Sequence, residues 1–258
     1  MAFGGPAVQR TINIVYKDKL CYRTRCRLVT EAIKYLLYER HQIPFPYGQV
    51  KMSLIRKETP TNPSGSAEDN IRRKPFLTRA FRREAKTREL IENFDELFSN
   101  LEVVFQSTRV FNVCLMFGPT QVSSKESFTF HFQSVLNSDC DLKCSDRTIG
   151  PLCRKLIRSL VANEEIANMK EISPTSMFIA VQSHKDDSVN WFLPKRTFKP
   201  PHRGQLYNIC ILTSSSESDI TDEAQKRFQN EDLLWFQAPV PIKGLKETKK
   251  AEETSLMF

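Results

Sequence analysis

The sequence lacks the short motifs by which several large enzyme classes are recognised. It contains no Gly-x-Gly-x-x-Gly loop for dinucleotides, no Gly-x-Ser-x-Gly nucleophile elbow and no His-Glu-x-x-His zinc motif. Residues 118–127, GPTQVSSKES, imitate a phosphate-binding loop. They lack the second Gly of such a loop and the Lys directly before Ser, which together position phosphates and magnesium. We therefore predict a protein that is not an enzyme, has no catalytic residues and uses no cofactor.

Long apolar runs and paired cysteines are also missing. No stretch reaches the roughly 18 apolar residues of a transmembrane helix, and the first residues do not form a signal peptide. Seven Cys, an odd number without such a signal, indicate a reducing intracellular compartment. Cys140, Cys144 and Cys153 lack the second tight ligand pair of a zinc site, so we predict no metal site. A Cys nucleophile with a distant His stays open, because such partners meet only in the fold.

Positive charge is present in excess, with 38 Lys and Arg against 30 Asp and Glu. The densest part of this excess lies between residues 72 and 88. The run contains Arg72, Arg73, Lys74, Arg79, Arg82, Arg83, Lys86 and Arg88. One interpretation is a nuclear-localisation or phosphate-contacting patch of a basic nucleic-acid-binding protein. The other is the solvated first turns of the next helix, since only two aromatic residues are interleaved.

Hydrophobic periodicity predicts helices at residues 23–42, 89–106 and 146–168, each with apolar side chains three and four residues apart. Strands are predicted at residues 11–16, 109–117, 128–132, 177–182, 206–212 and 233–242. Pro44 and Pro46 predict extended backbone, and Pro239 and Pro241 predict that the last strand lies at an edge or pairs along one side. We expect one α+β domain over residues 1–258, with loops at 57–75 and 214–232 and a frayed tail at 246–258.

The helix predicted at residues 146–168 carries two apolar ridges. Asp146 is the expected N-cap, and Pro151 fits the first turn. The first ridge contains Ile149, Leu152, Leu156 and Leu160, with Cys153 beside it. The second contains Ile157 and Val161, bordered by Arg154 and Arg158. A one-sided surface helix needs only the first ridge. The second ridge therefore either meets another protein or packs into a core that covers the whole helix.

Four colinear segments resemble the comet family of spindle-checkpoint adaptors. They are YLLYERHQIPFPYGQVK at 35–51, LCRKLIRSLV at 152–161, WFLPKRTFKPPHRG at 191–204 and DLLWFQAPVPIKGLKE at 232–247. The likeness runs from about residue 14 to residue 247, while residues 57–75 and 214–232 match poorly. It implies a HORMA-like fold, in which three helices pack on a central antiparallel sheet and a C-terminal segment closes as a safety belt.

The resemblance also implies a function. Members of this family are non-enzymatic adaptors that bind the closed conformer of the mitotic-arrest-deficient HORMA protein as a heterodimer, by mimicking its dimerisation partner. They present it to the pachytene-checkpoint AAA+ ATPase for remodelling, which silences the spindle checkpoint and allows mitotic exit. We therefore expect the chain in the nucleus and cytoplasm, and at the spindle and kinetochore in mitosis. The alternative from the residues alone is nucleic-acid binding through residues 72–88.

The resemblance assigns site residues by matching positions. The surface for the HORMA partner is expected to contain Glu39, Arg40, Arg154, Ile157, Arg158 and Val161. The contact for the ATPase is expected to contain Pro194 and Lys195. The family pattern has Gln where Glu39 stands and Phe where Ile157 stands. Because Ile buries less apolar area than Phe, we expect a loss of about 1 kcal/mol in partner binding at that position. The family pattern also has a longer acidic N-terminal extension, which we expect this chain to lack.

Overall fold

A computed structural model describes residues 8–58, 74–132, 144–187, 189–214 and 233–245. The predicted insert at 214–232, apart from its first residue, and the tail at 246–258 lie outside these residues. In chain order the elements are β1 (Val8–Tyr16), α1 (Tyr22–Glu39), α2 (Tyr47–Glu58), α3 (Lys74–Ser107), β2 (Asn112–Gly118), β3 (Glu126–Phe132), α4 (Asp146–Val161), α5 (Glu164–Ala167), β4 (Ser176–His184), β5 (Leu193–Pro194), β6 (Gln205–Thr213), β7 (Leu233–Gln237) and β8 (Ile242–Lys243). Within the described ranges, no helix has both the length and the apolarity to cross a membrane.

The strands form one eight-stranded sheet in the order β1-β6-β3-β2-β4-β7-β5, with β8 also paired to β4. The β2–β3 hairpin is antiparallel, as predicted, and β4 is antiparallel to β2, β7 and β8. The expectation of an antiparallel sheet throughout is wrong, because β6 runs parallel to both β1 and β3. Long stretches of chain that include helices separate these three strands, and only short turns force neighbouring strands to run antiparallel.

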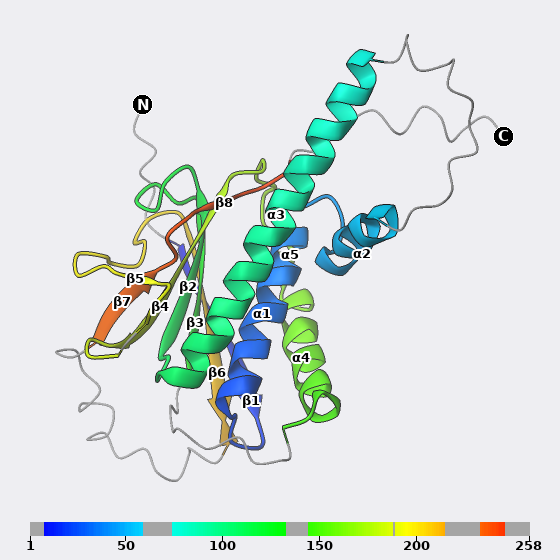
Figure 1. Ribbon diagram of the computed structural model, residues 1–258. Coiled ribbons are helices and arrows are strands. Elements are labelled where there is room, and N and C mark those ends of the chain that lie inside the picture. The colour runs from blue at the N-terminus through cyan, green and yellow to red at the C-terminus, as the bar shows by residue number, and fades with distance from the viewer. Residues whose placement is uncertain (1–7, 59–73, 133–143, 188, 215–232, 246–258) are drawn as a thin grey trace.

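The described helices gather on one side of the sheet, with α1 between α3 and α4 (Figure 1). Alternation along β1 directs Ile12, Ile14 and Tyr16 into the core beneath the helices and leaves Asn13 and Val15 exposed. The predicted apolar face of residues 89–106 is buried along α3, including Phe94 and Leu97. In this layered arrangement most of α1 is buried, while α4 keeps one side outward.

Three helix predictions need correction. Residues 47–58 form α2, which was not predicted; it begins directly after Pro46, whose carbonyl accepts a hydrogen bond from the amide of Gln49 at 2.8 Å. Residues 57–58 and 74–75 of the predicted loop are helical, and residues 59–73 lie outside the described part of the chain. The third long helix ends at Val161, because Asn163 caps the separate short helix α5. The N-cap of α4 is Ser145, so Asp146 occupies the first turn instead.

The aromatic residues of the last third are buried on both faces of the sheet. Phe192 lies in the core on the helical side, whereas Trp235 packs with Cys114 and Met116 on the opposite face. Phe198 covers this second cluster, with its ring centroid 5.4 Å from that of Trp235. The last predicted strand is divided into β7 and β8 by the Pro-containing residues 238–241. Contrary to the one-sided pairing expected, β7 pairs with β4 on one side and with β5 on the other.

Candidate partner-binding surface

The first ridge of α4 seats this helix on the rest of the molecule. Ile149, Cys153, Leu156 and Leu160 are buried. Helix α4 contacts α1 and β1. The Tyr16 hydroxyl donates a hydrogen bond of 3.1 Å to the carbonyl of Leu152, and the Lys155 ammonium lies 5.3 Å from the centroid of the Tyr16 ring. Burial raises the pKa of Tyr16, which therefore stays protonated as the donor. These contacts fix the position of α4 and the direction of its outer face.

The second ridge of α4 is not covered by this chain's described residues. The Val161 side chain is 56% exposed, and Arg154 and Arg158 are exposed beside it. Ile157 is intermediate, because one side of it packs against the edge of the main core. The interpretation that both ridges are core is therefore wrong for Val161. Val161 therefore remains at the surface as an exposed apolar side chain, on the same helix as the exposed Arg154 and Arg158.

Glu39 lies at the last residue of α1, next to the exposed Tyr38. Helices α1 and α4 run in the same direction, because Arg23 at the start of α1 lies 3.6 Å from Asp146 at the start of α4. Their C-terminal ends therefore lie at the same end of the helical layer (Figure 1). Glu39 and Val161 thus lie toward the same end of the two helices. We call the five expected residues other than Arg40 the α1–α4 face: Glu39, Arg154, Ile157, Arg158 and Val161.

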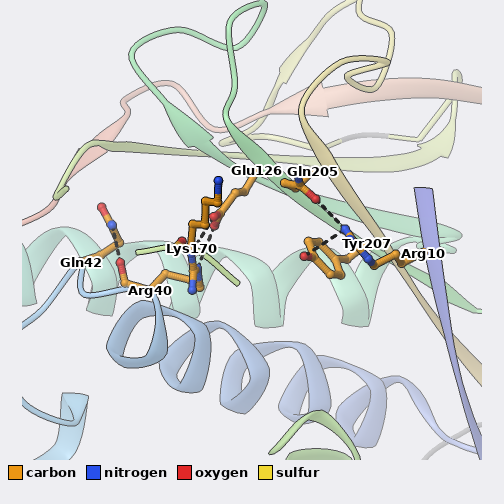
Figure 2. A network of polar contacts seen from close by, with 7 residues as sticks. All are labelled: Arg10, Arg40, Gln42, Glu126, Lys170, Gln205 and Tyr207. Carbon is orange, nitrogen blue, oxygen red and sulfur yellow. Dashed lines mark hydrogen bonds and ion pairs between the residues drawn. The ribbon is translucent and has the colours of Figure 1, made fainter. Parts of the chain in front are cut away.

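Arg40, the sixth residue expected on this surface, is buried inside the chain's own fold. Its side chain is held by Glu126 of β3, with Nε to Oε2 at 2.9 Å and Nη2 to Oε1 at 2.6 Å (Figure 2). Nη2 also donates to the carbonyl of Lys170. With 2% of its surface exposed, Arg40 does not lie on the α1–α4 face, and the expectation that it faces a partner is not met here. Nothing in the sequence indicates that Arg40 pairs with Glu126, which lies 86 residues away.

Residues 40–42, which follow α1, also connect the helical layer to the C-terminal segment at residues 242–245. The Gln42 amide nitrogen donates to the carbonyl of Arg40 at 2.6 Å (Figure 2). The Gln42 side-chain oxygen accepts from the amide of Thr175 at 2.8 Å, and its backbone carbonyl accepts from the amide of Leu245 at 2.8 Å. These contacts of Gln42 are not predictable from the sequence, because a polar residue after a helix does not indicate such distant partners.

Pro194 and Lys195 lie at the edge of the sheet formed by β5, whereas α4 contacts β1 at the other edge. Pro194 belongs to β5, the strand at the far end of the sheet from β1, and both side chains are exposed. The amide of Lys195 donates to the carbonyl of Trp235 at 2.8 Å, which holds the segment against β7. Phe192 is buried and anchors the preceding residues. The structure therefore separates the two sets of expected contacts and presents each at a surface.

The basic run lies partly on α3. Arg82, Arg83 and Lys86 are exposed on this helix, and Arg88 lies 3.8 Å from Glu84. Arg72 and Arg73 lie outside the described residues, as do the side chains of Lys74 and Arg79. The part that the structure describes is therefore a solvated helical surface, the second of the two interpretations of this run. Nucleic-acid binding through it stays a prediction.

The arrangement can now be compared with known proteins. A family model described as "p31comet: Mad1 and Cdc20-bound-Mad2 binding" matches residues 7–247. Two relatives named "MAD2L1-binding protein", from Mus musculus and Homo sapiens, are each 26% identical over 236 residues, which is 92% of this chain and 79% and 80% of theirs. The mixed α+β architecture is compatible with a HORMA-like fold. Because the family match spans nearly every described element, the chain belongs to the p31comet family.

Proposed function

We propose that this chain is a non-enzymatic adaptor that binds Mad2 in its Cdc20-bound, closed form through the α1–α4 face. The names of the family and of its relatives support Mad2 as the partner. One structural observation carries the choice of surface. Val161 is 56% exposed, one turn beyond the exposed Arg158, on a helix whose first ridge packs into the core.

The chemistry of this face suits a complex between two proteins that fold separately. Val161 and the outer part of Ile157 supply apolar area that a partner can remove from water. Arg154 and Arg158 each carry a planar guanidinium that can form two parallel hydrogen bonds to one carboxylate. Arg is also enriched among the residues that contribute most to protein–protein binding. Glu39 accepts hydrogen bonds from a basic or polar group of the partner. A small apolar centre with a charged rim is typical of complexes that form and dissociate.

We further propose that the complex is delivered to the pachytene-checkpoint AAA+ ATPase through Pro194 and Lys195, which silences the spindle checkpoint and allows mitotic exit. The exposed position of both residues at β5 supports this part of the proposal. ATP hydrolysis belongs to the ATPase. Residues 233–245, which pair with β4 and reach Gln42, serve as the safety belt. The chain acts in the nucleus and cytoplasm and at the mitotic spindle and kinetochore, where its partner acts.

Val161→Glu tests the proposed surface. The substitution places a carboxylate where an apolar contact is expected, so we expect the Kd for Mad2 loaded with a Cdc20 segment to rise at least about 30-fold. Arg158→Glu should raise it by a similar factor. Isothermal titration calorimetry measures both values.

The matched control is Val103→Glu on α3, where the replaced Val is also 56% exposed. We expect this control to bind like the original chain. All three variants should melt within about 2 °C of it, because each changes an exposed side chain. Unchanged affinity of both Val161→Glu and Arg158→Glu would place the Mad2 contact elsewhere on the molecule.

A further inference from the structure

Two cysteines from distant parts of the chain meet where α1 and α4 begin. The Sγ atoms of Cys21 and Cys144 lie 2.9 Å apart, although the residues are 123 positions apart in the sequence. Cys21 is the N-cap of α1, and Cys144 lies just before the N-cap of α4. A disulfide bond needs the sulfurs about 2.05 Å apart, so a movement of less than about 1 Å would join them.

Neighbouring groups hold the two cysteines in this position. The Arg23 guanidinium donates to the carbonyl of Cys144 at 3.3 Å and lies 3.6 Å from a carboxylate oxygen of Asp146. The Cys21 sulfur accepts a hydrogen bond from the amide of Thr24 at 3.5 Å. One arginine thus braces the end of α4 that carries Cys144, while the first turn of α1 orients Cys21.

Two arginines, Arg23 and Arg25, lie near this pair. Arg25, one turn after Cys21, is 2% exposed, and its Nε and Nη1 atoms find no hydrogen-bond partner among the described residues. Burial lowers the pKa of Arg25, and its interaction with Cys21 acts in the opposite direction. The dipole of α1 adds partial positive charge at its N-terminal end. The thiolate is the reactive form of cysteine.

Other cysteines of the chain have different surroundings. Cys26 and Cys114 are buried, and burial raises the pKa of each thiol to about 12. Burial also raises the pKa of Cys153. These thiols stay protonated and shielded. Cys144 is only half-buried, so a small oxidant in solution reaches it more readily than the buried Cys21.

We propose that Cys21 and Cys144 form a reversible disulfide that links the N-terminal ends of α1 and α4. With hydrogen peroxide as oxidant, the Cys144 thiolate attacks one peroxide oxygen, the O–O bond breaks and a sulfenic acid forms. The Cys21 thiolate then attacks the Cys144 sulfur and displaces hydroxide. The two thiols lose two electrons, the peroxide becomes two water molecules, and these take up both thiol protons. A dithiol reductant reverses the reaction.

Peptide mapping of the full chain tests this link. Trypsin cuts after Lys19, Arg23, Lys143 and Arg147, so Cys21 falls in residues 20–23 and Cys144 in residues 144–147. After peroxide treatment and alkylation, we expect mass spectrometry to find these two peptides joined, and dithiothreitol to separate them. The oxidised chain should melt about 5–10 °C higher than the reduced chain, because a link across so long a loop restricts the unfolded state.

Matched substitutions identify the pair. Cys21→Ser keeps a side chain suited to the N-cap and should abolish both the joined peptides and the rise in Tm, as should Cys144→Ser. Cys140→Ser and Cys153→Ser should retain both effects. The proposal is overturned if peroxide yields only sulfenic or sulfinic acid at Cys144, or if Cys144 is found joined to the peptide that contains Cys140.

Discussion

The pair formed by Arg40 and Glu126 is the most enclosed charged contact in the described structure. Two hydrogen bonds connect the guanidinium to the carboxylate, and both side chains are almost fully buried. Burial raises the pKa of Glu126, and the contact with Arg40 opposes that rise. Each charge is tolerated in the interior because the other is present.

Arg40→Met should lower the free energy of unfolding by about 3–5 kcal/mol, because Glu126 would keep a buried charge without its partner. Urea denaturation at pH 8 measures this loss. The control is Arg88→Met, which breaks an exposed pair within α3 and should cost less than about 1 kcal/mol. Equal losses in the two variants would mean that Arg40 contributes no more than a surface charge.

The same variant should respond to pH. Without Arg40, the pKa of Glu126 in the folded state rises further above its unfolded value, so the folded state binds more protons. Stability then increases as the pH falls toward the unfolded pKa of Glu, about 4.3, and decreases as the pH rises. We expect the deficit of Arg40→Met relative to the original chain to be smaller at pH 5 than at pH 8. A deficit that grew on acidification would contradict this account of Glu126.

Helix α4 carries two apolar ridges, one packed into the core and one at the surface. Leu156→Ala should lower the free energy of unfolding by about 2–5 kcal/mol, because Leu156 is fully buried in the main core. Val161→Ala should change it by less than about 0.5 kcal/mol, since this side chain is mostly exposed. Ile157→Ala should fall between these values. Chemical denaturation of the three variants measures the order, and similar losses at Leu156 and Val161 would mean that both ridges are core.

The elements that the sequence predicted best are those with strong periodicity. The apolar face of α3 and the alternating strand β3 needed no information from distant residues. Helix α2 was not predicted, because Pro44 and Pro46 indicate extended backbone and the helix begins directly after them. The parallel pairing of β6 was missed because strand direction depends on how the intervening helices cross the sheet.

Some residues of the candidate site could be predicted from the sequence, and others could not. Counting ridges on the helix made Val161 a candidate for exposure, since one ridge suffices to seat α4, but it left open whether the core covers the second ridge. The burial of Arg40 is not predictable from the sequence, because a charged residue at a helix end is usually exposed to solvent. Its partner Glu126 lies in a segment that the sequence presented as an imitation of a phosphate loop. The proximity of Cys21 and Cys144 likewise depends on how α1 and α4 pack.

The two proposed contact regions lie near opposite edges of the sheet. The α1–α4 face is next to β1, and Pro194 and Lys195 lie at β5, the other end of the sheet (Figure 1). Sites that share no side chains usually contribute independently to binding. A Mad2 molecule on the α1–α4 face would therefore leave the β5 edge open to a second partner, as an adaptor requires.

Pro194→Ala combined with Lys195→Ala tests this separation. Because both side chains are exposed and far from α4, we expect the Kd for Cdc20-bound Mad2 to change less than about twofold. ATPase-driven release of Mad2 should slow by at least about tenfold, since the double variant removes both residues assigned to that contact. Release is measured by fluorescence from labelled Mad2 in the presence of ATP, with Lys199→Ala as the control at another exposed position of the same segment. Normal release by the double variant would remove β5 from the proposed ATPase contact, and weakened Mad2 binding would show that the two regions are coupled.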